Sequence, residues 1–289
     1  MTIPRSIAAS DREFPFDDRH FELFRSLAGE LAGIELDDTK RELVYGRLAR
    51  RLRALGLASF DSYAARLRVD GPNELPEFVN AITTNVTSFF RESHHFAFLA
   101  DEAIPDLLTR RSVSRRLRIW SAACSTGQEP YSIAITAATT LPGDTTWDCR
   151  ILATDIDGSV VATAEAGTYP IDTLPDRGLL PDRSRWFRAI ESSDRREVRV
   201  AEELRSMIYF RRLNLIDPWP MQGPIDIIFC RNVVIYFSTE TQRRLFRRFA
   251  EILAPDGYLF VGHSESILHS ADLFESVGRT VYRPRQVRP

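Results

Sequence analysis

Hydrophobic residues near the N-terminus recur three or four positions apart, which is the spacing of one face of a helix. Phe21, Phe24, Leu27 and Leu31 follow this spacing, and Gly33 is a typical helix end. The same pattern predicts further helices over residues 38–55, 59–68 and 75–84, with a turn at 70–73. We therefore expect an all-helical domain that ends at residue 84.

Beyond residue 116, short apolar runs alternate with helical segments. Predicted strands begin at Leu117 and cover 150–154, 207–213, 226–230, 258–262 and 280–283; predicted helices begin near Pro130 and cover 159–166 and 239–253. Strands that alternate with helices form a mostly parallel sheet with helices on both faces, so an α/β fold is expected. The charged stretch 175–203 interrupts this rhythm and predicts a hairpin-bearing insertion.

The last of these predicted helices, 239–253, is amphipathic, with arginines on its outer face. Thr239 and Gln242 fit a capping box at its start. The sequence Pro255-Asp256-Gly257 predicts a turn directly after it.

The stretch Leu117–Ile135 joins a predicted strand to a predicted helix through small residues. Ser125, Thr126 and Gly127 are turn formers, and Pro130 suits the first helical turn. Such a junction lets a ligand approach bare backbone at a helix N-terminus. A generic junction is equally consistent with these residues, because the full G-x-G-x-x-G fingerprint is absent.

Composition narrows the class of protein. The chain has 289 residues, 44% of them hydrophobic and 27% charged, and a net charge of -2, which argues against bulk binding of nucleic acid. Cys124, Cys149 and Cys230 lack metal-ligand spacing and are expected to be reduced thiols. Neither a leader-like N-terminus nor a span-length apolar run is present, so we expect a cytoplasmic protein without membrane insertion.

Polar residues at the ends of predicted strands are the candidates for chemistry. Asp155 is placed to accept hydrogen bonds from ribose hydroxyls, although a helix N-cap is the alternative role. Arg231 and Asn232 directly follow an apolar strand, where ligands bind in open α/β sheets, and an ordinary polar loop is the alternative. Asn214-Leu215 ends the preceding strand.

Other reactive side chains favour packing roles. His94 and His95 are adjacent, so on a helix they point in different directions and do not predict a metal site. His263 is expected to bond locally, and Cys124 to pack as a small residue. We expect no metal.

Five ordered motifs resemble the chemotaxis receptor methyltransferases, the CheR family of class I S-adenosylmethionine-dependent enzymes. They are Asn85-Val-Thr-Ser-Phe-Phe-Arg-Glu92, Ser121-Ala-Ala-Cys-Ser-Thr-Gly-Gln-Glu-Pro-Tyr-Ser132, Ala153-Thr-Asp-Ile-Asp157, Phe229-Cys-Arg-Asn-Val-Val-Ile-Tyr-Phe237 and Pro255-Asp-Gly-Tyr-Leu-Phe-Val-Gly-His-Ser-Glu265. The resemblance implies a Rossmann-like doubly wound sheet over 85–289, a small helical receptor-docking domain over 1–84, and a small β insertion at about 175–206.

The resemblance also implies roles for individual residues. Asn85, Thr87 and Arg91 would reach the cofactor from the linker, and Glu129 and Asp155 would hold its polar parts, Asp155 the ribose. Asn214-Leu215 and Arg231-Asn232 would frame the adenine and the methionine end. Gln128 and Cys124 depart from the family pattern, where a second acid and an alanine are common.

The implied reaction is methylation of glutamate side chains on chemoreceptors, which gives methyl esters and S-adenosylhomocysteine. A glutamate carboxylate is already ionised near neutral pH, so it needs no general base. This agrees with the lack of a Ser/His/Asp or Cys/His constellation in the sequence. Arg91 is expected to pair with the incoming carboxylate, and Tyr236 to orient it.

The implied partner is the cytoplasmic helical bundle of chemoreceptors, which would recruit a monomeric enzyme to membrane-bound receptor arrays. Arg47, Arg50, Arg51 and Arg53 form the expected docking surface, although a solvated helix face is the simpler interpretation of such a run. Two alternatives remain open: a methyltransferase with another acceptor, and a weakly active cofactor-binding signalling scaffold.

Overall fold

The chain divides into two compact units between Thr84 and Asn85. The structure, a computed structural model, describes residues 12–143, 147–180, 182–190 and 196–285. Each unit is described separately below.

The N-terminal unit is helical. Its elements are α1 (Asp18–Ala32), a 3₁₀ turn (Asp38–Lys40), α2 (Arg41–Leu55), α3 (Phe60–Val69) and α4 (Gly71–Ile82). Gly33 and Gly56 end α1 and α2 with φ values of 69° and 64°, a left-handed conformation that glycine adopts without strain. Aromatic side chains fill the core, with Phe21, Phe24 and Phe60 fully buried.

The turn predicted at residues 70–73 is wrong in its extent. Only Asp70 separates α3 from α4, and Gly71 and Pro72 already belong to the first turn of α4. A proline is tolerated there because its missing N–H would have no partner within the helix.

The second unit is built on a seven-stranded sheet in the order β6-β2-β1-β7-β8-β10-β9. The strands are β1 (Arg116–Ala122), β2 (Asp148–Asp155), β6 (Ile208–Arg212), β7 (Ile225–Cys230), β8 (Leu253–Val261), β9 (Phe274–Gly278) and β10 (Val281–Pro284). All pairs from β6 to β8 are parallel, and β10 pairs antiparallel with β8 and β9. The predicted α/β class and mostly parallel sheet are confirmed.

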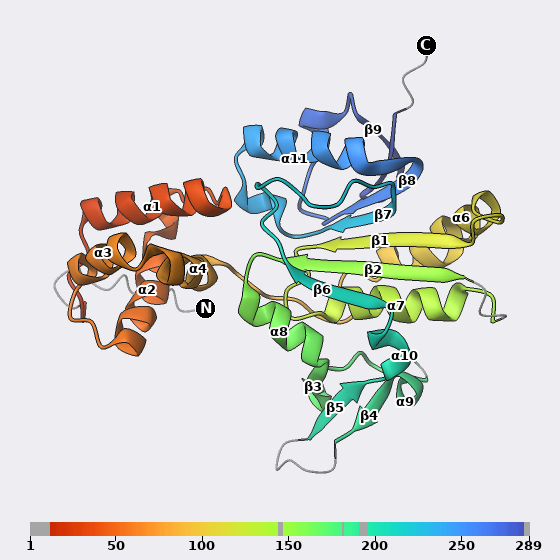
Figure 1. The fold of residues 1–289 in the computed structure, drawn as a ribbon, viewed down its shortest axis with the longest axis horizontal. Coiled ribbons are helices and arrows are strands. Elements are labelled where there is room, and N and C mark those ends of the chain that lie inside the picture. The colour runs from red at the N-terminus through yellow and green to blue at the C-terminus, as the bar shows by residue number, and fades with distance from the viewer. Residues whose placement is uncertain (1–11, 144–146, 181, 191–195, 286–289) are drawn as a thin grey trace, which may run out of the picture. The chain divides into compact units, whose positions relative to one another are not determined.

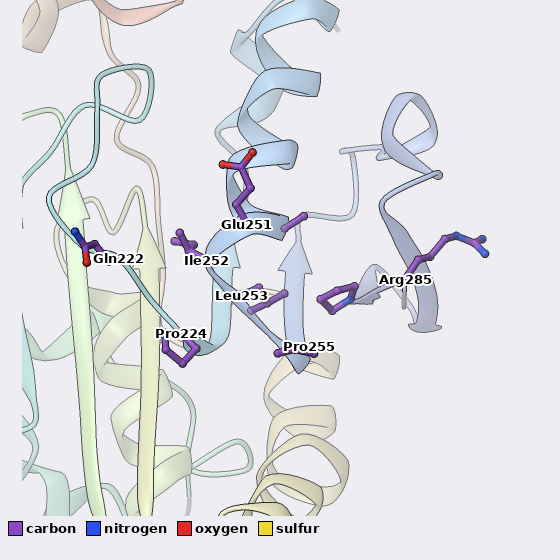
Figure 2. A pocket seen from close by; sticks show the side chains of 9 residues that line it. Gln222, Pro224, Glu251, Ile252, Leu253, Pro255 and Arg285 are labelled. Atoms are coloured by element: carbon purple, nitrogen blue, oxygen red, sulfur yellow. The ribbon is translucent and has the colours of Figure 1, made fainter. Parts of the chain in front are cut away.

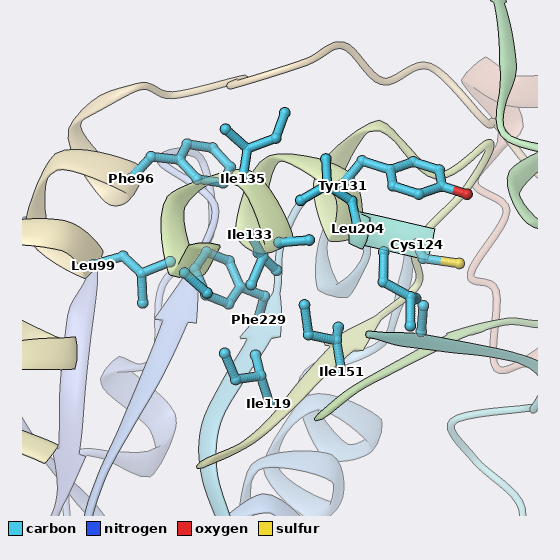
Figure 3. Close-up of a cluster of buried hydrophobic side chains, with 14 of the residues drawn as sticks. Phe96, Leu99, Ile119, Cys124, Tyr131, Ile133, Ile135, Ile151, Leu204 and Phe229 are labelled. Atoms are coloured by element: carbon cyan, nitrogen blue, oxygen red, sulfur yellow. The ribbon is translucent and has the colours of Figure 1, made fainter. Parts of the chain in front are cut away.

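Helices cover both faces of this sheet (Figure 1). One face carries α5 (His94–Phe98), a π-helical turn (Leu99–Ala103), α6 (Ile104–Arg110), α7 (Gln128–Thr140) and α8 (Gly158–Ala166); the other carries α11 (Thr239–Ile252). Successive side chains of β1 point to opposite faces of the sheet. Ile119 therefore joins the core beneath α7 (Figure 3), and Trp120 joins the core beneath α11.

A second, three-stranded antiparallel sheet lies between β2 and β6 in the sequence, in the order β3-β5-β4. Its elements are β3 (Thr168–Pro170), a 3₁₀ turn (Ile171–Thr173), α9 (Arg183–Trp186), β4 (Phe187–Ala189), β5 (Glu197–Val200) and α10 (Glu202–Arg205). The predicted hairpin is the β4–β5 pair. The sheet gains a third strand, β3, from upstream of the predicted stretch.

Two local predictions around α11 are wrong. The N-cap is Ser238, whose hydroxyl accepts the Thr241 N–H, and Gln242 bonds elsewhere. The predicted turn at Pro255–Gly257 lies inside β8, whose pairing with β7 shifts register between Ile225 and Ile227. This irregularity accommodates residues that would interrupt a regular ladder.

None of the helices in the described ranges is both long enough and apolar enough to cross a lipid bilayer.

Candidate active site

Three central strands of the large sheet end side by side. Ala122 at the end of β1 pairs with Thr154 of β2 and with Cys230 of β7. The loops that follow these strands therefore meet at one carboxyl edge, which is where ligands bind in open α/β sheets. The sequence predicted a site from these loops, and the structure brings them together.

The loop between β1 and α7 is held in a strained left-handed conformation. Ala123, Ser125 and Gly127 have φ values of 72°, 50° and 97°. A side chain at Gly127 would lie 2.7 Å from Ala164 Cβ and from Tyr169 Oη, so only glycine fits there. The backbone N–H groups of Ala123 and Cys124 both donate to Thr154 O, which ties the loop to the end of β2.

Asp155 lies at the centre of this edge and is 6% exposed. Its Oδ2 accepts the Ser125 N–H at 2.8 Å, and its Oδ1 accepts the Asp157 N–H at 3.0 Å. Burial raises the pKa of Asp155, and hydrogen bonds from three backbone N–H groups, those of Asp157, Ser125 and Ile156, oppose that shift. An ionised carboxylate can accept about four hydrogen bonds, so Asp155 can still accept one from a hydroxyl group.

Asp157 takes the N-cap role that was the alternative for Asp155. Its Oδ1 accepts the Ser159 N–H at 2.8 Å at the start of α8. Its Oδ2 accepts a hydrogen bond from Asn85 Nδ2 at 2.8 Å, and the Ser125 hydroxyl donates to Asn85 O at 2.9 Å. Asn85 is thereby tied to the loops that follow β1 and β2.

Glu129 and Arg231 form a buried ion pair, with Oε2 and Nη1 3.1 Å apart. The Ser121 hydroxyl donates to Glu129 Oε1 at 2.8 Å. Burial raises the pKa of Glu129, and the Arg231 charge offsets part of that shift. Arg231 Nη2 donates to Arg91 O, while Arg231 Nε is buried without a partner among the described residues.

Glu92 connects the segment before α5 to the loops that follow β7 and β8. Its Oε1 lies 2.8 Å from His263 Nδ1 and accepts Asn232 Nδ2 at 3.3 Å, and its Oε2 accepts the His263 N–H at 3.1 Å. Burial opposes the charged form, but the bond from His263 and the charge of Arg231 prevail and lower the pKa of Glu92 to about 2. Glu92 is therefore an ionised anchor.

Glu92 and the buried acid Glu265 had no predicted role. Both lie inside the quoted motifs, Glu92 directly after Arg91 and Glu265 at the end of the last motif. The available signals were an acid beside a predicted site residue and an acid in the polar group that follows the apolar run Tyr258–Val261.

Two family models match the chain. One, described as CheR methyltransferase, SAM binding domain, matches residues 85–283. The other, described as CheR methyltransferase, all-alpha domain, matches residues 19–83. The chain belongs to the CheR methyltransferase family. It is an S-adenosylmethionine-dependent methyltransferase, as the sequence predicted.

Similar proteins match this CheR family member over most of its length. Chemotaxis protein methyltransferase 2 of Pseudomonas aeruginosa is 46% identical over 95% of this chain and 96% of its own length. A probable chemotaxis protein methyltransferase of Rhizobium etli is 44% identical over 87% of this chain and 94% of its own. The chemotaxis protein methyltransferase of Escherichia coli is 44% identical over 92% and 90%.

The carboxyl edge of this CheR sheet fits S-adenosylmethionine chemically. The ligand has ribose hydroxyls, which need acceptors, and a carboxylate, which needs donors. Asp155 retains acceptor positions, and Arg231 has a buried Nε that lacks a partner among the described residues. The left-handed backbone at Ser125 and Gly127 adds a stretch where a ligand meets little side chain.

The remaining predicted residues have different surroundings. Leu213 N donates to Asp155 O, which brings Asn214-Leu215 to the end of β2, but the Leu215 side chain is buried in the core beneath α11. Thr87 is partly exposed. Arg91 Nη1 donates to Val86 O at 2.9 Å within the linker. Tyr236 is partly exposed and ends a 3₁₀ turn, Val234–Tyr236.

His94 and His95 form a cluster with Glu92 in which the potential ligand atoms lie within 4.8 Å of one another. Arg231 Nη2 lies 3.5 Å from Glu92 Oε2, and this positive charge disfavours a second cation. His95 is fully buried against Phe260, which lowers its pKa to about 3. His95 therefore packs in the core, as predicted.

The arginines predicted to dock a receptor lie on α2 of the N-terminal unit. Arg51 binds Glu74 through two bonds of 2.9 Å, and Arg47 Nη2 donates to Thr84 Oγ1 at 2.6 Å. Arg50 and Arg53 are exposed, and Arg53 Nε lies 3.0 Å from Glu13 Oε2. Arg50 and Arg53 are thus the exposed arginines of this surface, and Glu13 offsets part of the charge of Arg53.

A pocket of about 510 Å³ lies away from the candidate site, at the starts of β7 and β8 (Figure 2). It is lined by Gln222, Pro224, Ala250, Glu251, Ile252, Leu253, Pro255, Pro284 and Arg285. The starts of parallel strands lie at the edge of the sheet opposite to their carboxyl ends, so this pocket is separate from the candidate active site.

Proposed function

We propose that this methyltransferase transfers the methyl group of S-adenosylmethionine to glutamate side chains of chemoreceptors during sensory adaptation. The products are glutamate methyl esters and S-adenosylhomocysteine. The observation that carries the proposal is the hydrogen-bonded junction of segment 85–92 with the loops after β1, β2 and β7. It brings the segment with Asn85 and Arg91 to Arg231 and Asn232, which supports the proposal in a family whose relatives are named chemotaxis methyltransferases.

The cofactor supplies an activated methyl group on a sulfonium centre. Asp155 accepts hydrogen bonds from the ribose hydroxyls. Glu129 and Arg231 provide opposite charges for the amino and carboxylate groups of the methionine end. Asn85 and Thr87 contribute contacts from the linker, and Asn232 and Asn214-Leu215 frame the remaining parts.

The protein's task toward the acceptor is to position it and to exclude water. The glutamate carboxylate is ionised near neutral pH and attacks without a general base. Arg91 pairs with this carboxylate in a bidentate way after its guanidinium leaves Val86 O, and Tyr236 orients it. No metal has a role in this scheme.

The receptor surface that fits is an acidic helical bundle. Arg50 and Arg53 on α2 present exposed positive charge, which attracts such a surface and weakens as salt rises. This attraction would recruit the enzyme to receptor arrays at the membrane.

The test is incubation of the protein with labelled S-adenosylmethionine and receptor-containing membranes, followed by mapping of the modified residue. Base-labile label on receptor glutamates is the expected result. Label on another residue type would favour the alternative acceptor, and binding measured by calorimetry without transfer would favour the scaffold.

Variants test the acceptor residues. Arg91→Ala and Tyr236→Phe should each lower kcat by tenfold or more. In Tyr236→Phe the affinity for S-adenosylhomocysteine should stay within about threefold of the wild-type value. Arg116→Ala and Tyr209→Phe are matched controls, because Arg116 is exposed at the start of β1 and Tyr209 lies along β6. Unchanged methylation in both test variants would refute these two roles.

A further inference from the structure

Glu265 is a buried carboxylate that the proposed reaction does not use. It lies four residues after the end of β8 and is 5% exposed. Burying a charged group is unfavourable unless hydrogen bonds satisfy it, so the partners of Glu265 indicate what it does.

Among the described residues, the Glu265 carboxylate accepts its hydrogen bonds from backbone N–H groups. Its Oε2 accepts from Asn232 N and Gly262 N, both at 2.7 Å. Its Oε1 accepts from Val233 N at 2.7 Å and from Val234 N at 2.8 Å. Burial raises the pKa of Glu265, and these four donors favour its charged form. Four short bonds saturate both oxygens, so Glu265 is neither a general base nor a ligand of the cofactor.

The loop that Glu265 holds has an unusual backbone. Asn232 adopts a φ of 60°, and the N–H groups of residues 232, 233 and 234 point to one place. Successive N–H groups in such a conformation form a concavity for an anion, and here the Glu265 carboxylate occupies it. Without this acceptor, three adjacent backbone donors would lose their partner in a buried region.

The same loop is held from the other side by α11. Gln242 Nε2 donates to Val234 O and to Phe237 O, both at 2.9 Å. Glu265 therefore takes the loop's donors, and Gln242 takes two of its acceptors. A side chain at Gly262 would lie 2.7 Å from Asn232 Nδ2 and from Glu265 Oε2, so the packing leaves little freedom there.

This loop carries residues of the candidate site at both ends. Arg231 precedes it, and the Asn232 side chain bonds to Glu92. Tyr236 lies two residues after Val234, in the 3₁₀ turn that starts at Val234. The Glu265 carboxylate reaches three of the four N–H groups between Arg231 and Tyr236.

We infer that Glu265 is a positioning residue that sets the conformation of the loop 232–236 and thereby orients Asn232 and Tyr236 for methyl transfer. The inference rests on the proposed function through Tyr236. Glu265 itself contacts neither substrate nor cofactor.

The test is Glu265→Gln, which keeps the size of the side chain but turns an NH₂ group toward two backbone donors. The expected result is a fall in kcat of about tenfold or more with a smaller change in the affinity for S-adenosylhomocysteine, together with faster amide hydrogen exchange at residues 232–236. Glu265→Asp keeps the carboxylate and should recover part of kcat. Glu275→Gln, an exposed acid on β9, is the matched control.

A double-mutant cycle with Tyr236→Phe separates positioning from general stability. If Glu265 acts through the loop, the double variant is about as slow as the slower single variant. The inference is overturned if the two substitutions multiply in their effects on kcat. It is also overturned if Glu265→Gln lowers the Tm but leaves kcat and hydrogen exchange at residues 232–236 normal. If Glu265→Gln does not fold, Glu265→Asp is measured in its place with the same readouts.

Failure of the proposed function has a different signature. If the wild-type protein methylates no receptor glutamate, the proposed reaction fails, and hydrogen exchange at 232–236 still tests whether Glu265 holds the loop. Unchanged exchange in Glu265→Gln would then refute the positioning role on its own.

Discussion

Each unit of the chain contains a glutamate paired with an arginine, and the two pairs differ in how fully they are satisfied. In the helical unit, Glu74 accepts two bonds of 2.9 Å from Arg51 and one of 3.3 Å from Arg66. In the methyltransferase unit, Glu129 accepts one bond of 3.1 Å from Arg231 and one of 2.8 Å from Ser121. The same residue types thus occupy different electrostatic settings.

The pKa values of the two glutamates shift in opposite directions. Burial raises the pKa of Glu74, but the bond and charge of Arg51, with smaller contributions from Tyr63 and Arg66, outweigh burial, and the net shift is downward. For Glu129 burial prevails over the single arginine, and the net shift is upward. The number of cationic donors relative to the depth of burial decides the sign.

This difference fits a pair that stabilises the fold of the helical unit and a second pair that, in our proposal, binds the cofactor. Arg51 binds Glu74 through Nε and Nη2, its Nη1 lies 3.7 Å from Glu77 Oε2, and its side chain is 23% exposed. Arg231 is almost fully buried, bonds to Glu129 and to Arg91 O, and keeps an Nε without a partner among the described residues. Incomplete satisfaction of a buried pair at a sheet's carboxyl edge is consistent with a ligand that completes it.

The largest effect should come from breaking the pair in the site. Glu129→Ala leaves the buried Arg231 with Glu92, 3.5 Å away, as its remaining carboxylate partner, and this should cost about 3 kcal/mol in the free energy of unfolding of that unit. The affinity for S-adenosylhomocysteine should fall by more than tenfold. Urea denaturation and calorimetry measure the two effects, with Glu165→Ala on the exposed side of α8 as control. Normal affinity in Glu129→Ala would break the comparison.

Breaking the pair in the helical unit should cost less and affect only stability. Glu74→Ala should cost ~1–3 kcal/mol, because the partly exposed Arg51 can turn toward water. Glu77→Ala, whose side chain is 48% exposed and lies 3.7 Å from Arg51, should cost at most ~1 kcal/mol. Affinity for S-adenosylhomocysteine should stay normal in both, and a loss in Glu74→Ala alone would show that this pair also serves the site.

Lowering the pH should protonate the two glutamates at different pH values. A pKa below the ordinary 4.5 means that the stabilisation from Glu74 is complete above pH 4.5 and is lost as pH falls through the lowered folded-state pKa. The raised pKa of Glu129 means that it is protonated first. As pH is lowered, the affinity for S-adenosylhomocysteine should therefore fall first. The difference in stability between the wild type and Glu74→Gln should disappear only at a lower pH. Calorimetry and thermal unfolding across an acid pH series test this order, and the reverse order would contradict it.

The smallest effect concerns exposed charge outside either pair. Reversing Arg50 and Arg53 to glutamate should weaken receptor binding at low salt by about 1 kcal/mol or less per residue, and less at high salt. Sedimentation with receptor membranes at two salt concentrations measures this, with Arg68→Glu on the exposed side of α3 as control. Equal losses in the control would remove the special role of this surface.

Much of the fold follows from local patterning. Helical spacing in the first unit and the strand–helix alternation in the second predicted their classes, because burying one face imposes its period on the sequence. Prediction failed where tertiary contacts outweigh local signals. The residues Pro255–Gly257 predict a turn, but they continue β8. Gln242 was predicted to cap a helix, but it donates hydrogen bonds to the loop after β7.

The candidate site shows the same division. Asp155, Arg231 and Asn232 were identifiable because polar residues directly after apolar strands must lie at the sheet edge. Glu92 and Glu265 were not, because their roles depend on partners far away in the sequence: Glu92 contacts His263, and Glu265 contacts Asn232.

The sequence by itself thus determined most of the order of elements, the family and the sheet edge that we propose as the site, since these depend on residue type and spacing along the chain. It did not predict β3 or β9. Only the tertiary structure decided which buried charges meet, and therefore which are saturated. The energy of a buried charge depends on every donor within a few ångströms, and the chain delivers those donors from distant positions.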